Sequence, residues 1–141
     1  MPVAMWRAMV CHMAATIGMP TAYSEHDVQR GVPVTAVPAL ARSLQLAVPE
    51  VLEWLSISPR TWARRKQAGT LDVLEGDRVA RLTRLVRRAG AVVGGAGEAR
   101  TWLTTPNAAL DRRTPLAVAA TEEGAESVFQ LLGRLEHGVF S

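Results

Sequence analysis

The chain from Trp102 to Thr121 carries closely spaced turn and capping residues, which limit this stretch to short helices. Two prolines, Pro106 and Pro115, each force the residue before them out of helical backbone geometry. Thr121 then precedes a segment whose apolar residues repeat at helical spacing. The pattern predicts a compact helical module that presents a surface, and nothing in it is typical of a catalytic motif.

The remaining sequence also predicts helices, so the expected fold class is all-α. Hydrophobic residues make up 48% of the 141 residues and aromatic residues only 5%, which favours a globular, helix-rich chain. No segment alternates apolar and polar residues as a half-buried strand does. Helices are predicted over residues 39–47, 49–55, 59–68, 77–89, 98–103 and 115–120, with a turn over 107–111 and a longer helix after Thr121.

The order of these segments predicts three parts. Residues 1–38 form a poorly defined segment, residues 39–76 a helix-turn-helix-like region, and residues 77–141 a C-terminal helical domain. In the middle part a short turn joins two helices, and Ser58 followed by Pro59 is a typical start for the second of them.

Positive charge is concentrated in the centre of the chain. From residue 58 to residue 100 there are ten Lys or Arg and four acidic residues, whereas the whole chain has 16 and 13. A helix-turn-helix places such a basic helix in the major groove, where Lys and Arg contact phosphates. A solvated face of a small bundle explains the same charges, and Trp62 is expected to pack inward. The candidate DNA contacts are Arg60, Arg64, Arg65 and Lys66.

The sequence offers little that is typical of an enzyme or a metal site. His12, His26 and His137 lie far apart, and the single cysteine, Cys11, has no disulfide partner. The acidic residues from 72 to 77 fit a loop that leads into the next helix. We therefore expect no catalytic residues, no cofactor and no bound metal. No uninterrupted apolar stretch is long enough to span a membrane, so we expect a cytoplasmic protein.

The segment from about Ser58 to Gly138 resembles the Xre/MbcA/ParS-type antitoxins. The run from Trp102 to Val128 is the specific part, because several spaced residues must match at once. Asp111-Arg112 departs from the family, where a Gly-containing step is more usual. The matching residues are Ser58-Pro59-Arg60-Thr61, Arg64-Arg65-Lys66, Gly69, Leu71, the helix from Asp77 to Leu85, Ala99, Trp102, Leu103, Pro106, Asn107, Ala109, Leu110, Arg113-Thr114-Pro115-Leu116, Thr121, Gly124, Ala125, Val128 and His137-Gly138.

This resemblance implies an Xre-like helical region followed by a toxin-binding domain. It implies an antitoxin of a type II toxin-antitoxin system, whose partner is a RES-domain or ParT-like toxin that consumes NAD or transfers its ADP-ribose part. The antitoxin would block the active-site cleft of that toxin. Family members commonly form homodimers and can repress their own operon, so operator DNA is a second expected partner. Two alternatives to the antitoxin function stay open: a DNA-binding repressor that acts without a toxin, and a structural helical adaptor.

Polar turn residues and the end of the chain are the candidate toxin contacts. Arginine is favoured at interface hot spots and pairs with carboxylates through two hydrogen bonds. A short polar tail that ends in an aromatic residue suits insertion into a cleft, although a frayed terminus explains it equally well. Trp102 and Leu103 are instead expected in the core, and Gly124 is expected to allow close packing or a tight cap. The candidates are Asn107, Arg112, Arg113, Glu136, His137, Gly138, Val139 and Phe140.

Overall fold

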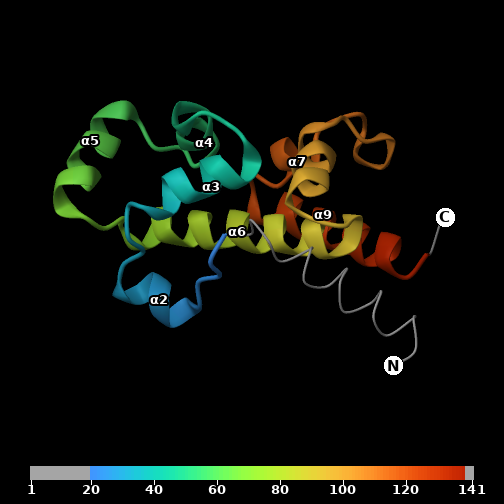
Figure 1. The fold of residues 1–141 in the computed structure, drawn as a ribbon, viewed down its shortest axis with the longest axis horizontal. Coiled ribbons are helices and arrows are strands. Elements are labelled where there is room, and N and C mark those ends of the chain that lie inside the picture. The colour runs from blue at the N-terminus through green and yellow to red at the C-terminus, as the bar shows by residue number, and fades with distance from the viewer. Residues whose placement is uncertain (1–19, 139–141) are drawn as a thin grey trace, which may run out of the picture. The chain divides into compact units, whose positions relative to one another are not determined.

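The computed structural model describes residues 20–138, and between them the regular elements are helices, which confirms the predicted all-α class (Figure 1). The described residues also contain two isolated β-bridges. One joins Pro33 and Thr70, and the other joins Asn107 and Arg113. The elements are α2 (Glu25–Arg30), α3 (Ala36–Leu44), α4 (Val48–Trp54), α5 (Pro59–Ala68), α6 (Val73–Val93), α7 (Ala96–Thr104), the 3-10 helix η1 (Ala108–Leu110), α8 (Pro115–Val118) and α9 (Glu122–Glu136).

The described residues fall into two compact units that share the long helix α6. One unit runs from Pro20 to Arg84, and the other contains the chain from Leu85 onward. The C-terminal part predicted from the sequence begins at residue 77 instead, and no helix is predicted before residue 39. The first unit includes helix α2 and the beginning of α3 in that early segment. No helix in residues 20–138 has the length and hydropathy that membrane crossing requires.

In the first unit, α3, α4 and α5 lie on one side of the first half of α6, and α2 lies on the other (Figure 1). The fully buried side chains of Leu40, Leu44, Val51 and Leu55 form the centre of its core. α3 begins at Ala36, three residues earlier than predicted. A proline in the first turn of a helix is tolerated because the first backbone N–H groups have no helical partner, so the proline at position 38 does not delay the start.

Helix α6 is longer than predicted at both ends. Asp72 Oδ1 accepts a hydrogen bond from the backbone N–H of Glu75 (2.7 Å), and the Glu75 carboxylate accepts one from the N–H of Asp72 (3.0 Å). This reciprocal capping starts the helix where the sequence analysis expected a loop. The helix also continues past Gly90 to Val93, because a single glycine costs only about 1 kcal/mol in a helix whose other residues are well packed.

The second unit follows the predicted turn and capping pattern. α7 ends before the Thr105-Pro106 step, and the side chains of Thr114 and Thr121 cap α8 and α9 by accepting hydrogen bonds from backbone N–H groups. α8 packs against both α7 and α9. The core of this unit contains the fully buried residues Leu85, Val86, Ala89, Ala99, Leu103, Val128 and Leu132.

Gly124 is required where α8 meets α9. A Cβ atom at this position would lie 1.8 Å from the carbonyl oxygen of Val118, far inside van der Waals contact. The sequence-based prediction that this glycine allows close packing is therefore confirmed.

Candidate functional site

The basic helix α5 lies in the first unit and forms the second half of a helix-turn-helix. It spans Pro59–Ala68 as predicted, with Ser58 as N-cap and Gly69, at a φ of 87°, as left-handed C-cap. The turn before it is held by the buried side chains of Leu55 and Ile57 and by Arg78, whose guanidinium donates a hydrogen bond to the carbonyl of Leu55 (3.1 Å). The orientation of α5 on its unit is thus fixed by packing and by a polar contact from α6.

Of the four predicted DNA contacts, Arg60, Arg64 and Lys66 are exposed. The Lys66 ammonium lies 5.9 Å from the centre of the Trp62 ring. Trp62 itself is 9% exposed, so the expectation that it packs inward is confirmed. These three cations therefore remain available to a ligand in solution.

Arg65, the fourth predicted contact, is instead bound to two carboxylates of the chain. Its Nε lies 2.8 Å from Glu75 Oε2, and its Nη2 lies 3.1 Å from Asp72 Oδ2 and 3.2 Å from Glu75 Oε1. The hydrogen bond to Glu75 is the main cause that raises the pKa of the Arg65 guanidinium. Because Glu75 is buried, this pairing ties α5 to the start of α6 and neutralises the Arg65 charge.

In the second unit, residues 107–113 form a turn closed by its own hydrogen bonds. Asn107 accepts from the N–H of Ala109 through its side chain (2.9 Å) and from the N–H of Arg112 through its carbonyl (2.9 Å), and its own N–H donates to the carbonyl of Arg113 (3.0 Å). Asp111 and Arg112 both adopt left-handed backbone, at φ of 55° and 62°. Asn107 thus builds the turn, and the exposed Arg112 and Arg113 project from it.

The other predicted toxin contacts lie at the end of α9. The Glu136 carboxylate forms an ion pair with Arg88 of α6, and the hydrogen bond from Arg88 is the main cause that lowers the pKa of Glu136. His137 and Gly138 are exposed after this ion pair. Val139 and Phe140 lie outside the described residues. In Figure 1 the turn that follows α7 and the end of α9 lie apart, so the predicted residues form two separate groups.

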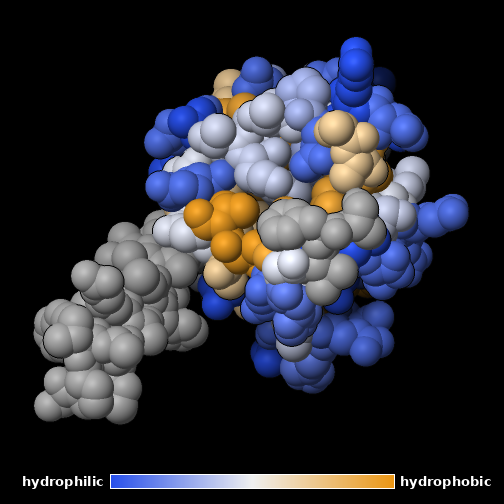
Figure 2. All heavy atoms as spheres, turned by 90° about the vertical axis from the view of Figure 1, so that its right-hand side faces the viewer, coloured by the Kyte–Doolittle hydropathy of each residue, from blue (hydrophilic) through white to orange (hydrophobic). Residues whose placement is uncertain are grey.

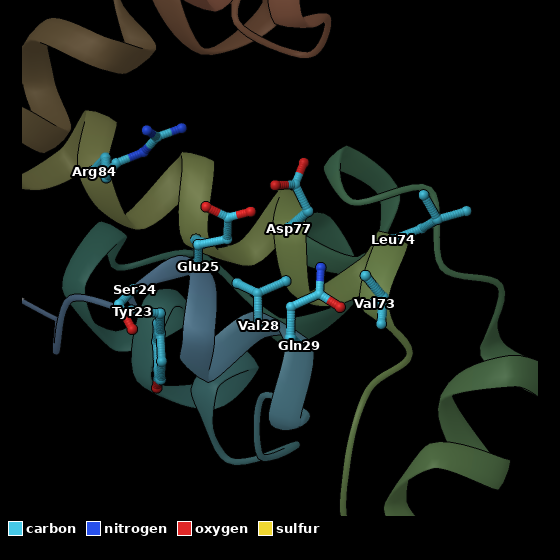
Figure 3. A pocket seen from close by; sticks show the side chains of 10 residues that line it. Tyr23, Ser24, Glu25, Val28, Gln29, Val73, Leu74, Asp77 and Arg84 are labelled. Atoms are coloured by element: carbon cyan, nitrogen blue, oxygen red, sulfur yellow. The ribbon is translucent and has the colours of Figure 1, made fainter.

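Two surface features were not found from the sequence. The first is a cleft between α2 and the start of α6, shown in Figure 3. At one end of it lie Val73 and Leu74, whose exposures of 44% and 69% mark them as the exposed large hydrophobic residues of the described chain. The sequence predicts a loop over residues 72–77, so Val73 and Leu74 were not expected on a helix. The capping pattern Asp72-x-x-Glu75 was the signal that could have revealed it.

The second feature is a shallow groove at the junction of α6 and α7. It is lined by Val93, Gly97, Glu98, Thr101 and Trp102. Trp102 is half-buried, so its predicted place in the core is wrong, whereas Leu103 is fully buried as predicted. The core positions of α7 are Ala99 and Leu103, one turn apart. Trp102 directly precedes Leu103, and neighbouring positions on a helix point to different faces, so the Trp102 side chain turns away from the core.

Comparison with known families assigns a role to each unit. Residues 25–84 match the family described as the antitoxin Xre-like helix-turn-helix domain, and residues 88–138 match the antitoxin Xre/MbcA/ParS C-terminal toxin-binding domain. A curated antitoxin Xre of Yersinia enterocolitica is 35% identical over 117 residues, which is 82% of this chain and 79% of the relative. An antitoxin Xre of Photorhabdus laumondii is 30% identical over 131 residues, 89% of this chain and 88% of the relative.

The chain belongs to the Xre antitoxin family. The resemblance found in the sequence is thereby confirmed, and this antitoxin belongs to a toxin-antitoxin system. The helix-turn-helix match lies within the Pro20–Arg84 unit, and the toxin-binding match lies within the unit that begins at Leu85. The exposed turn arginines, the end of α9 and the Trp102 groove therefore all belong to the toxin-binding domain.

Proposed function

We propose that this antitoxin neutralises a RES-domain or ParT-like toxin, which consumes NAD or transfers its ADP-ribose part, by covering the active-site cleft of that toxin. The observation that carries the proposal is the pair of exposed arginines, Arg112 and Arg113, on a turn that Asn107 closes within the toxin-binding domain. A turn whose backbone is already ordered loses little entropy on binding. Each guanidinium is then free to form a bidentate pair with a carboxylate of the toxin.

The end of α9 is the second part of the proposed toxin contact. The ion pair between Glu136 and Arg88 holds the last turn of α9, so His137 and Gly138 leave the domain from a defined point. We assign to these residues, together with Val139 and Phe140, entry into the toxin cleft. Glu136 supports this contact by anchoring the helix.

Replacement of the two turn arginines tests the proposal. Arg112→Gln and Arg113→Gln, combined in one chain, remove both charges without altering the hydrogen bonds that Asn107 makes. We expect toxin affinity to fall about tenfold or more, as for interface hot spots. The matched control is Arg60→Gln combined with Arg64→Gln, because both are exposed arginines of the helix-turn-helix unit, which the proposal does not assign to the toxin. Equal affinity of the turn variant and the control would refute the assignment of the turn.

Removal of residues 137–141 tests the chain end separately. The deletion keeps Glu136 and its ion pair, so the melting temperature should change little while neutralisation weakens. A truncated antitoxin that rescues toxin-expressing cells as well as the full chain would refute entry of the tail into the cleft.

DNA binding is the second function that we propose, and the helix-turn-helix supports it. Arg60, Arg64 and Lys66 are exposed on α5, the position of a recognition helix, and would contact operator phosphates. Affinity should fall steeply with salt, and Arg60→Ala or Arg64→Ala should each reduce the slope of log affinity against log salt by about 1. An unchanged salt dependence of the affinity would show that these side chains do not contact operator phosphates.

Self-association is proposed through the cleft between α2 and α6. Figure 3 shows Arg84 at one end and Leu74 at the other, with Glu25 and Asp77 between them. A second copy related by a twofold axis can bring the same patch against itself, covering Leu74 and pairing charges of opposite sign. Leu74→Asp should shift sedimentation to the monomer, and a monomeric unmodified chain would refute this surface.

A further inference from the structure

Helix α7 of the toxin-binding domain has two faces, and among the described residues 20–138 one of them packs into the core. Ala99 and Leu103 are fully buried and point into the core of the unit. Gly97, Glu98, Thr101 and Trp102 fall on a different side, since positions 97 and 101, and positions 98 and 102, are each one helical turn apart. With Val93 they line the groove at the junction with α6.

The groove combines an aromatic wall with a single charge. The ring of Trp102 is half-buried, which leaves apolar surface that no neighbouring side chain covers completely. Glu98, an exposed carboxylate, stands one turn before it on the same side. Tryptophan is enriched at interface hot spots, where it buries a large apolar area at little entropic cost. Figure 2 shows that the face of the molecule that it views is mostly hydrophilic, with hydrophobic residues at a few separate places.

The negative charge of the groove is unfavourable for operator DNA, the second proposed ligand of this protein. A phosphate backbone is repelled by Glu98, and the exposed cations of the helix-turn-helix lie in the other unit. The toxin is the partner that the domain containing the groove binds, as the family match over residues 88–138 describes. A toxin segment that carries an apolar side chain next to a lysine or arginine complements both the ring and the carboxylate.

We propose that the α6–α7 groove is a second docking site for the toxin, in which Trp102 anchors an apolar side chain of the toxin and Glu98 pairs with a neighbouring cation. The proposal rests on the proposed neutralisation of a toxin. It adds a contact on α7 to those assigned to the turn at residues 107–113 and to the end of α9. Such a site would increase the affinity for the toxin and the specificity for one toxin over another, because it is separate from residues 137–140, which are proposed to enter the toxin cleft.

Gly97 provides a way to block the groove without disturbing the fold. A Cβ at this position meets no atom within 4 Å, so a larger side chain has open space to occupy. Gly97→Tyr should therefore fill the groove while α7 stays folded, and Gly97→Ala is the matched control with a small side chain. Trp102→Ala removes the anchor itself, and Glu98→Lys reverses the rim charge.

The test measures binding of each variant to the purified toxin by calorimetry, with melting temperature as a check of folding. We expect Gly97→Tyr, Trp102→Ala and Glu98→Lys to weaken binding at least tenfold, and Gly97→Ala to bind as the unmodified chain does. Equal binding of Gly97→Tyr and Gly97→Ala would overturn the docking site. If the unmodified chain also failed to bind the toxin, neutralisation itself would be refuted, so the two failures can be distinguished.

Discussion

Replacement of Gly124 by alanine should break the joint between α8 and α9. The added Cβ would lie 1.8 Å from the carbonyl oxygen and 2.8 Å from the carbonyl carbon of Val118. These are backbone atoms at the end of α8, and they cannot move aside as the tip of a flexible side chain can. The same Cβ would lie 2.9 Å from Thr121 Oγ1, which accepts the capping hydrogen bond from the N–H of Gly124.

The expected cost is the sum of three effects. Overpacking typically destabilises by about 1 to 3 kcal/mol, and a contact this short belongs at the upper end of that range. Loss of the Thr121 cap adds about 1 kcal/mol, whereas the better helix propensity of alanine returns about 1 kcal/mol. The Gly124→Ala variant should therefore lose about 2 to 3 kcal/mol of unfolding free energy.

Urea unfolding followed by circular dichroism measures this loss, and the same helix offers a matched control. A Cβ at Gly133 of α9 would meet no atom within 4 Å, so Gly133→Ala should be neutral or should stabilise the protein by up to about 1 kcal/mol. If the two variants unfolded at the same urea concentration, the close approach of Val118 to Gly124 would be refuted.

Three further predictions follow from local contacts. Arg65→Gln should lower the urea midpoint, since it removes the positive charge that pairs with the buried Glu75 carboxylate, whereas Arg64→Gln should not. Ser56→Gly should raise the free energy of unfolding by up to about 1 kcal/mol, because Ser56 adopts a left-handed φ of 58° that glycine tolerates better. Unchanged unfolding curves would show that this backbone carries no strain. The Arg88 hydrogen bond lowers the pKa of Glu136 in the folded chain below its ordinary value. The pair therefore contributes its full stabilisation above the ordinary pKa, and that stabilisation is lost as pH falls through the lower pKa of the folded state. Glu136→Gln should remove that part of the acid dependence of the melting temperature, and an identical pH profile would contradict it.

Elements with local signals could be predicted from the sequence, and α5 is the clearest case. Its start is fixed by a capping serine and a proline, and its end by a glycine in left-handed backbone, so its predicted and observed bounds agree. Thr121 fixed the start of α9 in the same way. At the start of α6, capping was expected of the acidic residues, but the helix was predicted to begin at Asp77, whereas the reciprocal pair of Asp72 and Glu75 starts it at Val73.

Features that depend on distant contacts could not be predicted from the sequence. Arg65 was grouped with the other cations of α5, because its spacing places it on the basic helix and only the fold brings Glu75 against it. Trp102 was expected in the core on account of its size, but the helical position next to the buried Leu103 leaves it at the edge of a groove. The candidate toxin contacts at Asn107, Arg112 and Arg113 and at residues 136–140 stay predictions.

Neutralisation of a toxin is tested most directly by co-expression of the tagged antitoxin with the product of the neighbouring reading frame, as the candidate toxin. Co-purification and cellular NAD are measured in the same cultures. We predict a stable complex, and NAD that falls when the toxin is expressed alone and is restored when the antitoxin is present. Absence of a complex together with unrestored NAD would contradict toxin neutralisation by this chain.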